Sequence, residues 1–289
     1  TTHRQQGMMP LTHVGTFFSL VKATLKSNIL PVFIFDGPPE TMKRAPNPGL
    51  VGRAHSLYKQ FLKGGDPYDE EISNALWKSR AMRSYFAAEH LRSLGSVVGV
   101  PTITAPSEAE MLASALCRDE VVETVLSNDV DALLFASPHV TKQLQSSNNR
   151  ILRAKLEDFE SHMGLDIEQL RDLAVLCGCD FHPEGVKGIG PRKGTILLQR
   201  HGSLLEVLKA KGFSHSQRQE YIIAREVFDE PNYISTEYHR FSLNPPIVSK
   251  LSRLLEPVMS RTALEATVLR MVKLWKGFGN QQSTLEQWL

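Results

Sequence analysis

The sequence has few cysteines and no long apolar run. Cys117, Cys177 and Cys179 are too few and too clustered for a disulfide framework, and the Cys-x-Cys pair has no His or Cys partners at zinc-site spacing. We therefore expect a protein of a reducing compartment. No stretch approaches the roughly 18 apolar residues that a membrane-spanning helix needs, so the sequence predicts no membrane association.

The chain also has little net charge, because 33 Lys and Arg face 31 Asp and Glu. Overall charge therefore predicts no class of partner, but the distribution is uneven. Residues 41–65 and 185–203 contain no acid. Such basic segments suit the phosphate backbone of a nucleic acid, and the alternative is an ordinary solvated surface.

The order of apolar segments predicts an α/β fold with a mostly parallel central sheet flanked by helices. The predicted strands are 30–35, 96–100 and 121–126, followed by a hairpin of 139–144 with 150–152. The predicted helices include 12–27, 72–94 and 167–177, whereas the proline-rich segment 45–49 is not expected to be regular helix. The length of 289 residues suits one large domain or two small ones.

Acids gather where predicted elements meet. Glu108 and Glu110 lie at a predicted helix start, and Asp129 and Asp131 follow an apolar strand. Residues two apart in a strand face the same side, so the two aspartates are expected to converge. Oxygen ligands select a hard cation such as Mg²⁺ or Mn²⁺. The alternative for Ser107-x-x-Glu110 is a capping box that needs no metal.

Two further acids stand at similar positions. Asp36 ends the predicted strand 30–35, at an edge where open α/β sheets bind ligands, although an Asp-Gly turn is the alternative. Asp180 follows the helix 167–177 and precedes Gly188-Ile-Gly190. Backbone N–H groups at such a glycine turn, with Pro191 opening the next helix, can seat a phosphate. The alternative is a plain helical hairpin.

Four motifs fall in order along the chain: Phe35-Asp-Gly37, Ala105-Pro-Ser-Glu-Ala-Glu110, Asn128-Asp-Val-Asp131, and Leu176-Cys-Gly-Cys-Asp180 with Gly188-Ile-Gly-Pro191. Together they resemble the flap endonuclease / XPG family of structure-specific 5′ nucleases, over nearly the whole chain. The resemblance implies a nuclease core with a helical arch at about 41–94 and a helix-two-turn-helix. It also implies two Mg²⁺ ions, with Mn²⁺ as a substitute, and cleavage of DNA that carries a 5′ flap.

The resemblance assigns roles to individual residues. The implied metal ligands are Asp36, Glu108, Glu110, Asp129, Asp131 and Asp180. The implied catalytic cations are Lys43 and Arg53, and the implied DNA contacts are Lys187, Gly188, Gly190, Arg192 and Lys193. The backbone carbonyls of Gly185, Val186 and Ile189 are implied to hold a K⁺ ion. The implied sliding-clamp peptide is Gln282, Leu285, Trp288 and Leu289, for which a tail docked on its own domain is the alternative.

The family pattern also starts earlier than this sequence does. It begins with a strand that supplies a further aspartate and an aromatic residue, and we expect that an N-terminal segment is missing. The expected regions are a nuclease core at 1–160, a helix-two-turn-helix region at 161–275 and a tail at 276–289. The resemblance implies a monomer that acts in replication and base excision repair, in the nucleus of a eukaryote or otherwise in the cytoplasm. The alternatives are a Holliday-junction or excision nuclease and a non-catalytic DNA- and clamp-binding module.

Overall fold

The computed structural model describes Met9 and residues 11–37, 48–64, 66, 68–129, 131–145, 150–229 and 240–286. The side chains of 143–145, 150–151 and 279–286 are outside this description. By its internal contacts the chain forms two compact units. Unit 1 comprises residues 1–35, 46–103 and 241–289, and unit 2 comprises 36–45 and 104–240. The predicted functional regions have their boundaries at residues 160 and 275, which are not boundaries of these two units. These regions stay predictions.

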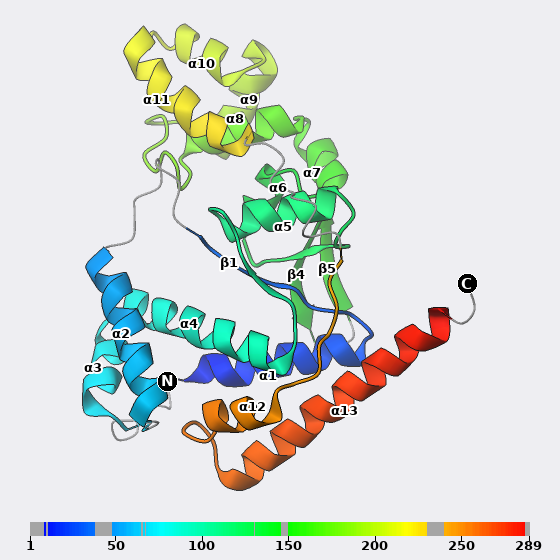
Figure 1. Cartoon of the computed structure of the whole chain (residues 1–289). Coiled ribbons are helices and arrows are strands. Elements are labelled where there is room, and N and C mark those ends of the chain that lie inside the picture. Colours follow the sequence, from blue (N-terminus) through cyan, green and yellow to red (C-terminus); the bar gives the residue numbers. More distant parts are fainter. Residues whose placement is uncertain are drawn as a thin grey trace. The chain divides into compact units, whose positions relative to one another are not determined.

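Unit 1 is largely helical (Figure 1). Its helices are α1 (Thr12–Lys26), α2 (Pro48–Gly64), α3 (Glu70–Lys78), α4 (Arg80–Val98), α12 (Val248–Leu255) and α13 (Arg261–Glu286). The strands β1 (Phe33–Phe35) and β2 (Thr102–Thr104) pair with each other. One apolar cluster joins α1, α4, α12 and α13, and a second joins α2, α3 and α4. No helix among the described residues is long and apolar enough to span a membrane.

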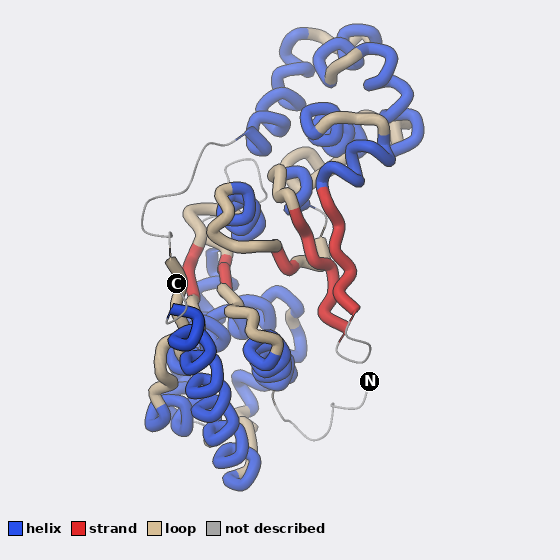
Figure 2. The backbone as a smooth tube through the Cα atoms, turned by 90° about the vertical axis from the view of Figure 1, so that its right-hand side faces the viewer, coloured by secondary structure: helices blue, strands red, loops and turns tan. Residues whose placement is uncertain are grey.

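Unit 2 combines a small sheet with helices (Figure 2). Its elements are α5 (Ala109–Arg118), β3 (Val125–Leu126), α6 (Asp131–Leu134), β4 (His139–Gln145), β5 (Arg150–Lys155), α7 (Leu156–Met163), α8 (Ile167–Cys177), α9 (Pro191–His201), α10 (Leu204–Ala210), α11 (His215–Glu226) and the 3₁₀ helix η1 (Val227–Asp229). Strand β3 runs parallel to β4, and β4 pairs antiparallel with β5. The predicted hairpin is thereby confirmed.

Local sequence signals explain many of the boundaries. Helix α9 begins at Pro191, whose missing N–H costs nothing in a first turn, and it ends at Gly202. Helices α8 and α11 each begin with a capping box, formed by Asp166 with Gln169 and by Ser214 with Gln217. The predicted helices 12–27 and 167–177 are confirmed as α1 and α8.

Three predictions about unit 1 are wrong. The single helix predicted over 72–94 is two helices, because Ser79 is extended and its hydroxyl caps α4 by accepting the Met82 N–H at 3.2 Å. The strand predicted at 96–100 is instead the end of α4, which Gly99 terminates with φ +88°, and β2 follows it. Pro48 and Gly49 lie inside α2, since proline is tolerated in a first helical turn.

Candidate metal and nucleic-acid site

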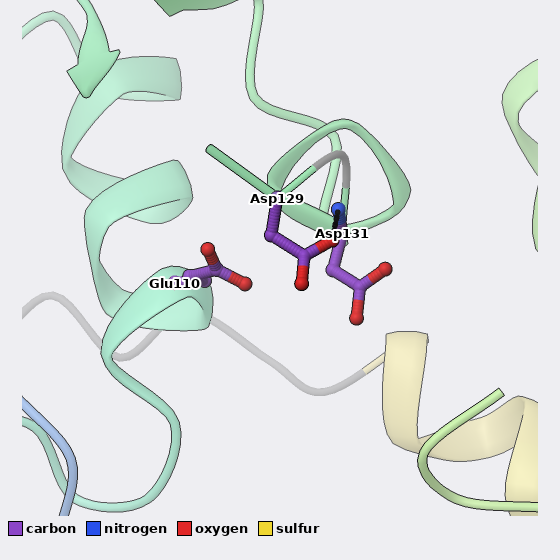
Figure 3. Close-up of side chains that lie close together, drawn as sticks. All are labelled: Glu110, Asp129 and Asp131. Atoms are coloured by element: carbon purple, nitrogen blue, oxygen red, sulfur yellow. Dashed lines mark hydrogen bonds between the residues drawn. The ribbon is translucent and has the colours of Figure 1, made fainter. Parts of the chain in front are cut away.

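Three carboxylates of unit 2 converge (Figure 3). Glu110, Asp129 and Asp131 each offer an oxygen, and these oxygens lie within 4.8 Å of one another. Glu110 and Asp131 are half-buried, and Asp129 is exposed. Carboxylate oxygens at this spacing are a donor set that fits Mg²⁺ or Mn²⁺.

A turn, and not strand alternation, brings the two aspartates together. Strand β3 ends at Leu126, before either of them. The Ser127 hydroxyl accepts the Asp129 N–H at 3.0 Å, and the Asp129 carboxylate accepts the Asp131 N–H at 3.3 Å. Asp131 then opens α6. The predicted convergence is present, but the predicted strand 121–126 is correct only for its last two residues, since 121–123 bend.

Helix α5 positions Glu110 in its first turn. The capping box considered as an alternative does not form, because Glu108 occupies the N-cap position and the Ser107 hydroxyl contacts the Met111 sulfur at 3.8 Å. The Glu110 carboxylate instead accepts a hydrogen bond from the Ser127 hydroxyl. Ser127 therefore contacts both Glu110 and the turn of Asp129. Glu108, at the start of α5, is half-buried.

Asp36 joins the start of α5 from a distant part of the sequence. Its carboxylate accepts the Ala109 N–H at 2.9 Å, which satisfies a donor at the helix N-terminus. Gly37 permits this approach, since its own N–H reaches the Ser107 carbonyl at 2.6 Å and an added Cβ would lie 2.1 Å from the Ala105 carbonyl oxygen. Asp36 thus lies beside the segment that carries Glu108 and Glu110.

Asp180 follows α8, next to Cys179. Burial raises the pKa of the Cys179 thiol, and the negative charges of Asp131 and Asp180 raise it further. The thiol therefore stays protonated at neutral pH. Asp180 itself is exposed.

The loop between α8 and α9, together with the first turn of α9, separates its residues by exposure. The predicted DNA-contacting residues are exposed: Lys187, Gly188, Gly190, Arg192 and Lys193. The residues predicted to hold K⁺ are buried: Gly185, Val186 and Ile189.

Helix α11 contacts the buried side of this loop through Tyr221. The Tyr221 hydroxyl donates to the Gly185 carbonyl at 3.1 Å, and the Tyr221 ring stacks on His182 at 4.2 Å between centroids. Gly185 has φ +54°, and an added Cβ would lie 2.6 Å from the Cys177 carbonyl carbon. These contacts hold the buried side of the loop, while Lys187, Gly188 and Gly190 are exposed.

The other predicted residues lie in unit 1 or outside the described residues. Arg53 is exposed on α2, in unit 1. Lys43, Trp288 and Leu289 lie outside the described residues. Gln282 and Leu285 belong to the backbone of α13, but their side chains lie outside the description as well.

Sequence reasoning missed residues that support the site without being acids. Ser127 directly precedes Asn128-Asp129, and a hydroxyl between two acidic motifs was the available signal. Tyr221 and Arg171 gave no signal, because their partners Gly185 and Leu134 lie 36 and 37 residues away in the sequence.

The family comparison covers the residues that form the acid cluster. The family model described as XPG I-region matches residues 99–180, a range that includes Glu108, Glu110, Asp129, Asp131 and Asp180. The chain carries an XPG I-region. The predicted resemblance to the flap endonuclease / XPG family is therefore confirmed.

Similarity to curated relatives extends over most of the chain. Flap endonuclease 1 of Ostreococcus lucimarinus is 31% identical over 234 residues, which are 78% of this chain and 59% of the relative. Flap endonuclease 1 of Ostreococcus tauri is 29% identical over 244 residues, which are 81% of this chain and 62% of the relative. The chain spans about three fifths of the length of these relatives.

Solved structures agree on the fold. Flap endonuclease-1 from Methanococcus jannaschii superposes with a TM-score of 0.67 at 25% identity and covers 91% of this chain and 82% of its own. The catalytic core of Rad2 in complex with DNA substrate (0.64, 19%) and human GEN1 in complex with Holliday junction DNA (0.65, 18%) show likeness of fold alone. The predicted α/β nuclease-type fold is confirmed, although the sheets in the described residues are small.

Proposed function

We propose that this chain is the nuclease region of a structure-specific 5′ nuclease, which hydrolyses phosphodiesters in DNA that carries a 5′ flap. The observation that carries the proposal is the convergence of Glu110, Asp129 and Asp131 inside an XPG I-region. Similarity to flap endonuclease 1 proteins over about four fifths of the chain supports the same substrate class. Both 5′ flap endonuclease and 5′–3′ exonuclease activity are part of the proposal.

Carboxylate donors suit hard divalent ions, and we propose two such ions, with Mg²⁺ as the cofactor and Mn²⁺ as a substitute. Glu110, Asp129 and Asp131 would be central ligands, and the further acids at the edges of the cluster are Asp36, Glu108 and Asp180. When bound, such ions supply an activated water and stabilise the charge on the leaving oxygen. The carboxylates act as ligands, so the reaction needs no covalent protein intermediate. The Ser127 hydroxyl donates to the Glu110 carboxylate and accepts the backbone N–H of Asp129.

Lys43 and Arg53 are proposed to offset negative charge on the scissile phosphate. The exposed residues of the α8–α9 loop are proposed to contact the backbone of duplex DNA without reading its sequence. Lys193 already donates to the Gly188 carbonyl at 3.1 Å, which indicates that carbonyls of this loop accept a cation.

The proposed K⁺ ion is a separate question from the DNA contacts. The Gly185 carbonyl accepts from Tyr221 and the Val186 carbonyl accepts from the Ile189 N–H at 2.9 Å. Each carbonyl oxygen keeps a second lone pair. These groups fit a weakly bound K⁺ that stiffens the loop, and the test is whether DNA affinity is higher in K⁺ than in the same concentration of Na⁺.

The biological setting is likewise part of the proposal. The C-terminal residues Gln282, Leu285, Trp288 and Leu289 are proposed to bind a sliding clamp, which would bring the protein to replication and repair sites in a nucleus or nucleoid. We propose that the protein acts as a monomer. A clamp-binding measurement on the chain, with Trp288→Ala as the comparison, tests this part independently of cleavage.

A Holliday-junction or excision nuclease is the alternative enzyme, because the fold is shared with Rad2 and GEN1. Cleavage of end-labelled double-flap DNA and of a four-way junction in Mg²⁺ separates the alternatives, since the proposal predicts preference for the flap. A matched pair of variants, Asp131→Asn and the exposed α7 residue Glu157→Gln, tests the assignment of the cluster.

Binding of Mn²⁺ to the folded chain provides a readout that does not depend on cleavage. We expect Asp131→Asn to weaken Mn²⁺ binding and Glu157→Gln to leave it unchanged. Equal Mn²⁺ affinity of Asp131→Asn and the unaltered chain would contradict the metal assignment. DNA binding without any Mn²⁺ binding would favour the non-catalytic module.

A further inference from the structure

The short helix α6 carries Asp131 at its start, and it is too short to be stable by itself. It spans four residues, Asp131–Leu134. Because a helix nucleus is unfavourable until several turns have formed, a single turn depends on contacts from outside. The position of the Asp131 carboxylate is therefore set by whatever holds α6.

The four backbone carbonyls of α6 and the carbonyl of the next residue, Phe135, all accept hydrogen bonds. The first three accept from groups close in sequence or from α5: Asp131 from the Phe135 N–H at 3.0 Å, Ala132 from the Ser114 hydroxyl at 3.0 Å, and Leu133 from the Ala136 N–H at 2.9 Å. The last two point away from the turn, where a helix leaves its carbonyls without partners of its own. These two carbonyls accept from arginines.

Arg171 of α8 makes the shorter of the two arginine contacts. Its Nε donates to the Leu134 carbonyl at 2.7 Å, and Arg118 Nη1 donates to the Phe135 carbonyl at 3.4 Å. The Arg171 side chain is only 9% exposed. A cation at the C-terminal end of a helical turn also interacts favourably with the helix dipole.

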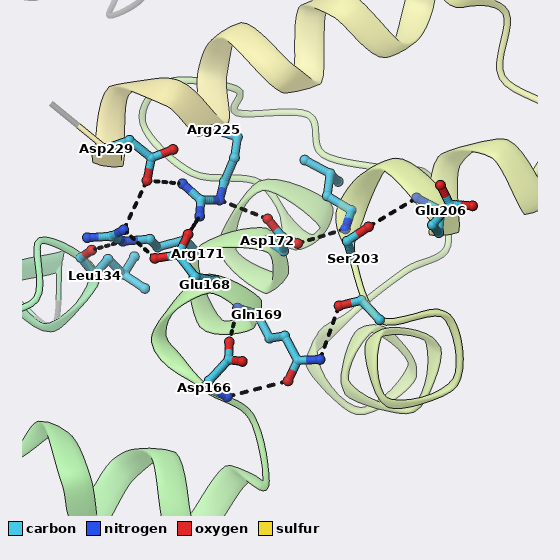
Figure 4. A network of polar contacts seen from close by, with 12 residues as sticks. Leu134, Asp166, Glu168, Gln169, Arg171, Asp172, Ser203, Glu206, Arg225 and Asp229 are labelled. Carbon is cyan, nitrogen blue, oxygen red and sulfur yellow. Dashed lines mark hydrogen bonds and ion pairs between the residues drawn. The ribbon is translucent and has the colours of Figure 1, made fainter.

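The rest of the Arg171 guanidinium is held in an ionic network (Figure 4). Its Nη1 contacts Glu168 at 2.9 Å and Asp229 at 3.0 Å. Arg225 of α11 contacts the same two acids, and it also donates to Asp172 at 2.8 Å. Asp172 in turn accepts the Leu204 N–H at the start of α10 at 2.7 Å. One network thus joins α8, α10, α11 and η1, and Arg171 extends it to α6.

We propose that Arg171 is a positioning residue for the metal site, which acts by fixing α6 and through it the Asp131 carboxylate. Arg118 assists at the neighbouring carbonyl. This inference rests on the proposed function, because it takes Asp131 as a metal ligand. It goes beyond that function because it makes Arg171, a residue of α8 outside the cluster, a determinant of ion affinity.

The test compares three variants by Mn²⁺ binding to the folded chain and by thermal unfolding. Arg171→Met removes the contact with the Leu134 carbonyl and is expected to raise the Mn²⁺ dissociation constant about tenfold, as is usual when a group that orients a metal ligand is lost. Arg171→Lys keeps a cation among the acids, but one ammonium cannot reproduce the planar fork of donors, so a rise is expected there too. Arg118→Met is expected to have a smaller effect, about two- to threefold, because its contact is longer.

Asp229→Asn is the matched control, since Asp229 belongs to the same network and pairs with Arg171 and Arg225 but, among the described residues, makes no hydrogen bond with α6. It is expected to lower the unfolding temperature and to leave the Mn²⁺ dissociation constant within twofold. If Arg171→Met fails to fold, Arg171→Lys carries the test. Unchanged Mn²⁺ affinity in the folded Arg171 variants, with weakened affinity in Asp131→Asn, overturns this inference and leaves the metal assignment intact. Unchanged affinity in Asp131→Asn overturns the proposed metal site itself.

Discussion

Unit 2 contains two groups of carboxylates that are held in different ways (Figures 3 and 4). Glu168, Asp172 and Asp229 contact the guanidinium groups of Arg171 and Arg225. In the cluster of Glu110, Asp129 and Asp131, Glu110 accepts from the hydroxyl of Ser127, and Asp129 accepts from the backbone N–H of Asp131. A guanidinium group compensates the negative charge of a carboxylate. A neutral donor orients a carboxylate without adding a compensating charge.

This difference separates a structural role from a binding role. In the network, burial disfavours the charged form of Arg225, but the hydrogen bonds and charges of Asp229 and Asp172 outweigh it and raise the pKa of Arg225. Two guanidinium groups thus face three carboxylates in the network, and burial still lowers the pKa of Arg171 and raises the pKa of Asp172. In the cluster, three carboxylate oxygens within 4.8 Å repel one another, and a divalent ion relieves that repulsion. Apart from Arg171, which also contacts α6, we expect substitutions in the network to change stability and substitutions in the cluster to change ion binding.

The largest expected effect is on the cluster. Asp131→Asn removes one ligand charge, so Mg²⁺-dependent cleavage of flap DNA and Mn²⁺ affinity are each expected to fall by at least about 100-fold, beyond the range for groups that only orient a ligand. Without divalent ions the variant is expected to be at least as stable as the unaltered chain, because a repulsive charge is gone. Calorimetric unfolding in EDTA measures this, and a clear loss of stability would show that the cluster is structural.

The network is expected to give the opposite result. Arg225→Met leaves the buried Asp172 without its guanidinium partner, and breaking a buried ion pair costs about 3–5 kcal/mol of unfolding free energy. Lys209→Met is the control on α10, because its ion pair with Glu206 is about half exposed and such pairs contribute about 0–1 kcal/mol. Urea unfolding of both variants tests the contrast, and equal losses would contradict it.

The acids of the cluster could be predicted from the sequence, whereas the roles of Arg171 and Arg225 in the network could not. Glu110, Asp129 and Asp131 could be found because each follows an apolar segment and because acids recur in short motifs. The start of α9 at Pro191 and its end at Gly202 were also predictable from the sequence, since these residues act through their own backbone conformations.

Contacts between distant segments could not be predicted. The hydrogen bond of Asp36 with Ala109 spans 73 residues, and that of Arg171 with Leu134 spans 37. Neither leaves a periodic pattern, because each depends on how elements pack. The break between α3 and α4 was missed for a similar reason: Arg83 donates to the Leu76 carbonyl at 2.7 Å and so stabilises the end of α3.

Ser127 tests the role of neutral donors at the cluster, because its hydroxyl contacts Glu110 and the turn of Asp129 without adding a charge. Ser127→Ala removes the donor to Glu110 and the acceptor of the Asp129 N–H. We expect Mn²⁺ affinity to fall about tenfold, in the range for such supporting groups. Ser127→Thr keeps the hydroxyl and is expected to restore most of the affinity. If both variants bind Mn²⁺ like the unaltered chain, the hydroxyl does not orient the ligands.

Unit 1 shows a third way to bury ionisable groups, namely in neutral form. His13 Nε2 and His90 Nδ1 are 3.0 Å apart, and the His90 ring packs among Tyr58, Phe61 and Phe86. Burial lowers the pKa of His13 to about 4, and burial together with the charge of His13 lowers the pKa of His90 to about 3. Neither arginine nor carboxylate is needed to keep a neutral imidazole in such a cluster.

The smallest expected effect follows from these neutral histidines. In the unfolded chain an imidazole titrates near pH 6.5, so the unfolded state binds more protons than the folded state below that pH. Stability is therefore full above about pH 6.5 and declines as the pH falls toward 4. Between pH 7 and pH 6 the loss is about 0.7 kcal/mol for each imidazole. Urea unfolding at several pH values measures this slope, which His13→Gln should reduce and the exposed control His215→Gln should leave nearly unchanged. An equal reduction in both variants would show that the slope does not come from the buried pair.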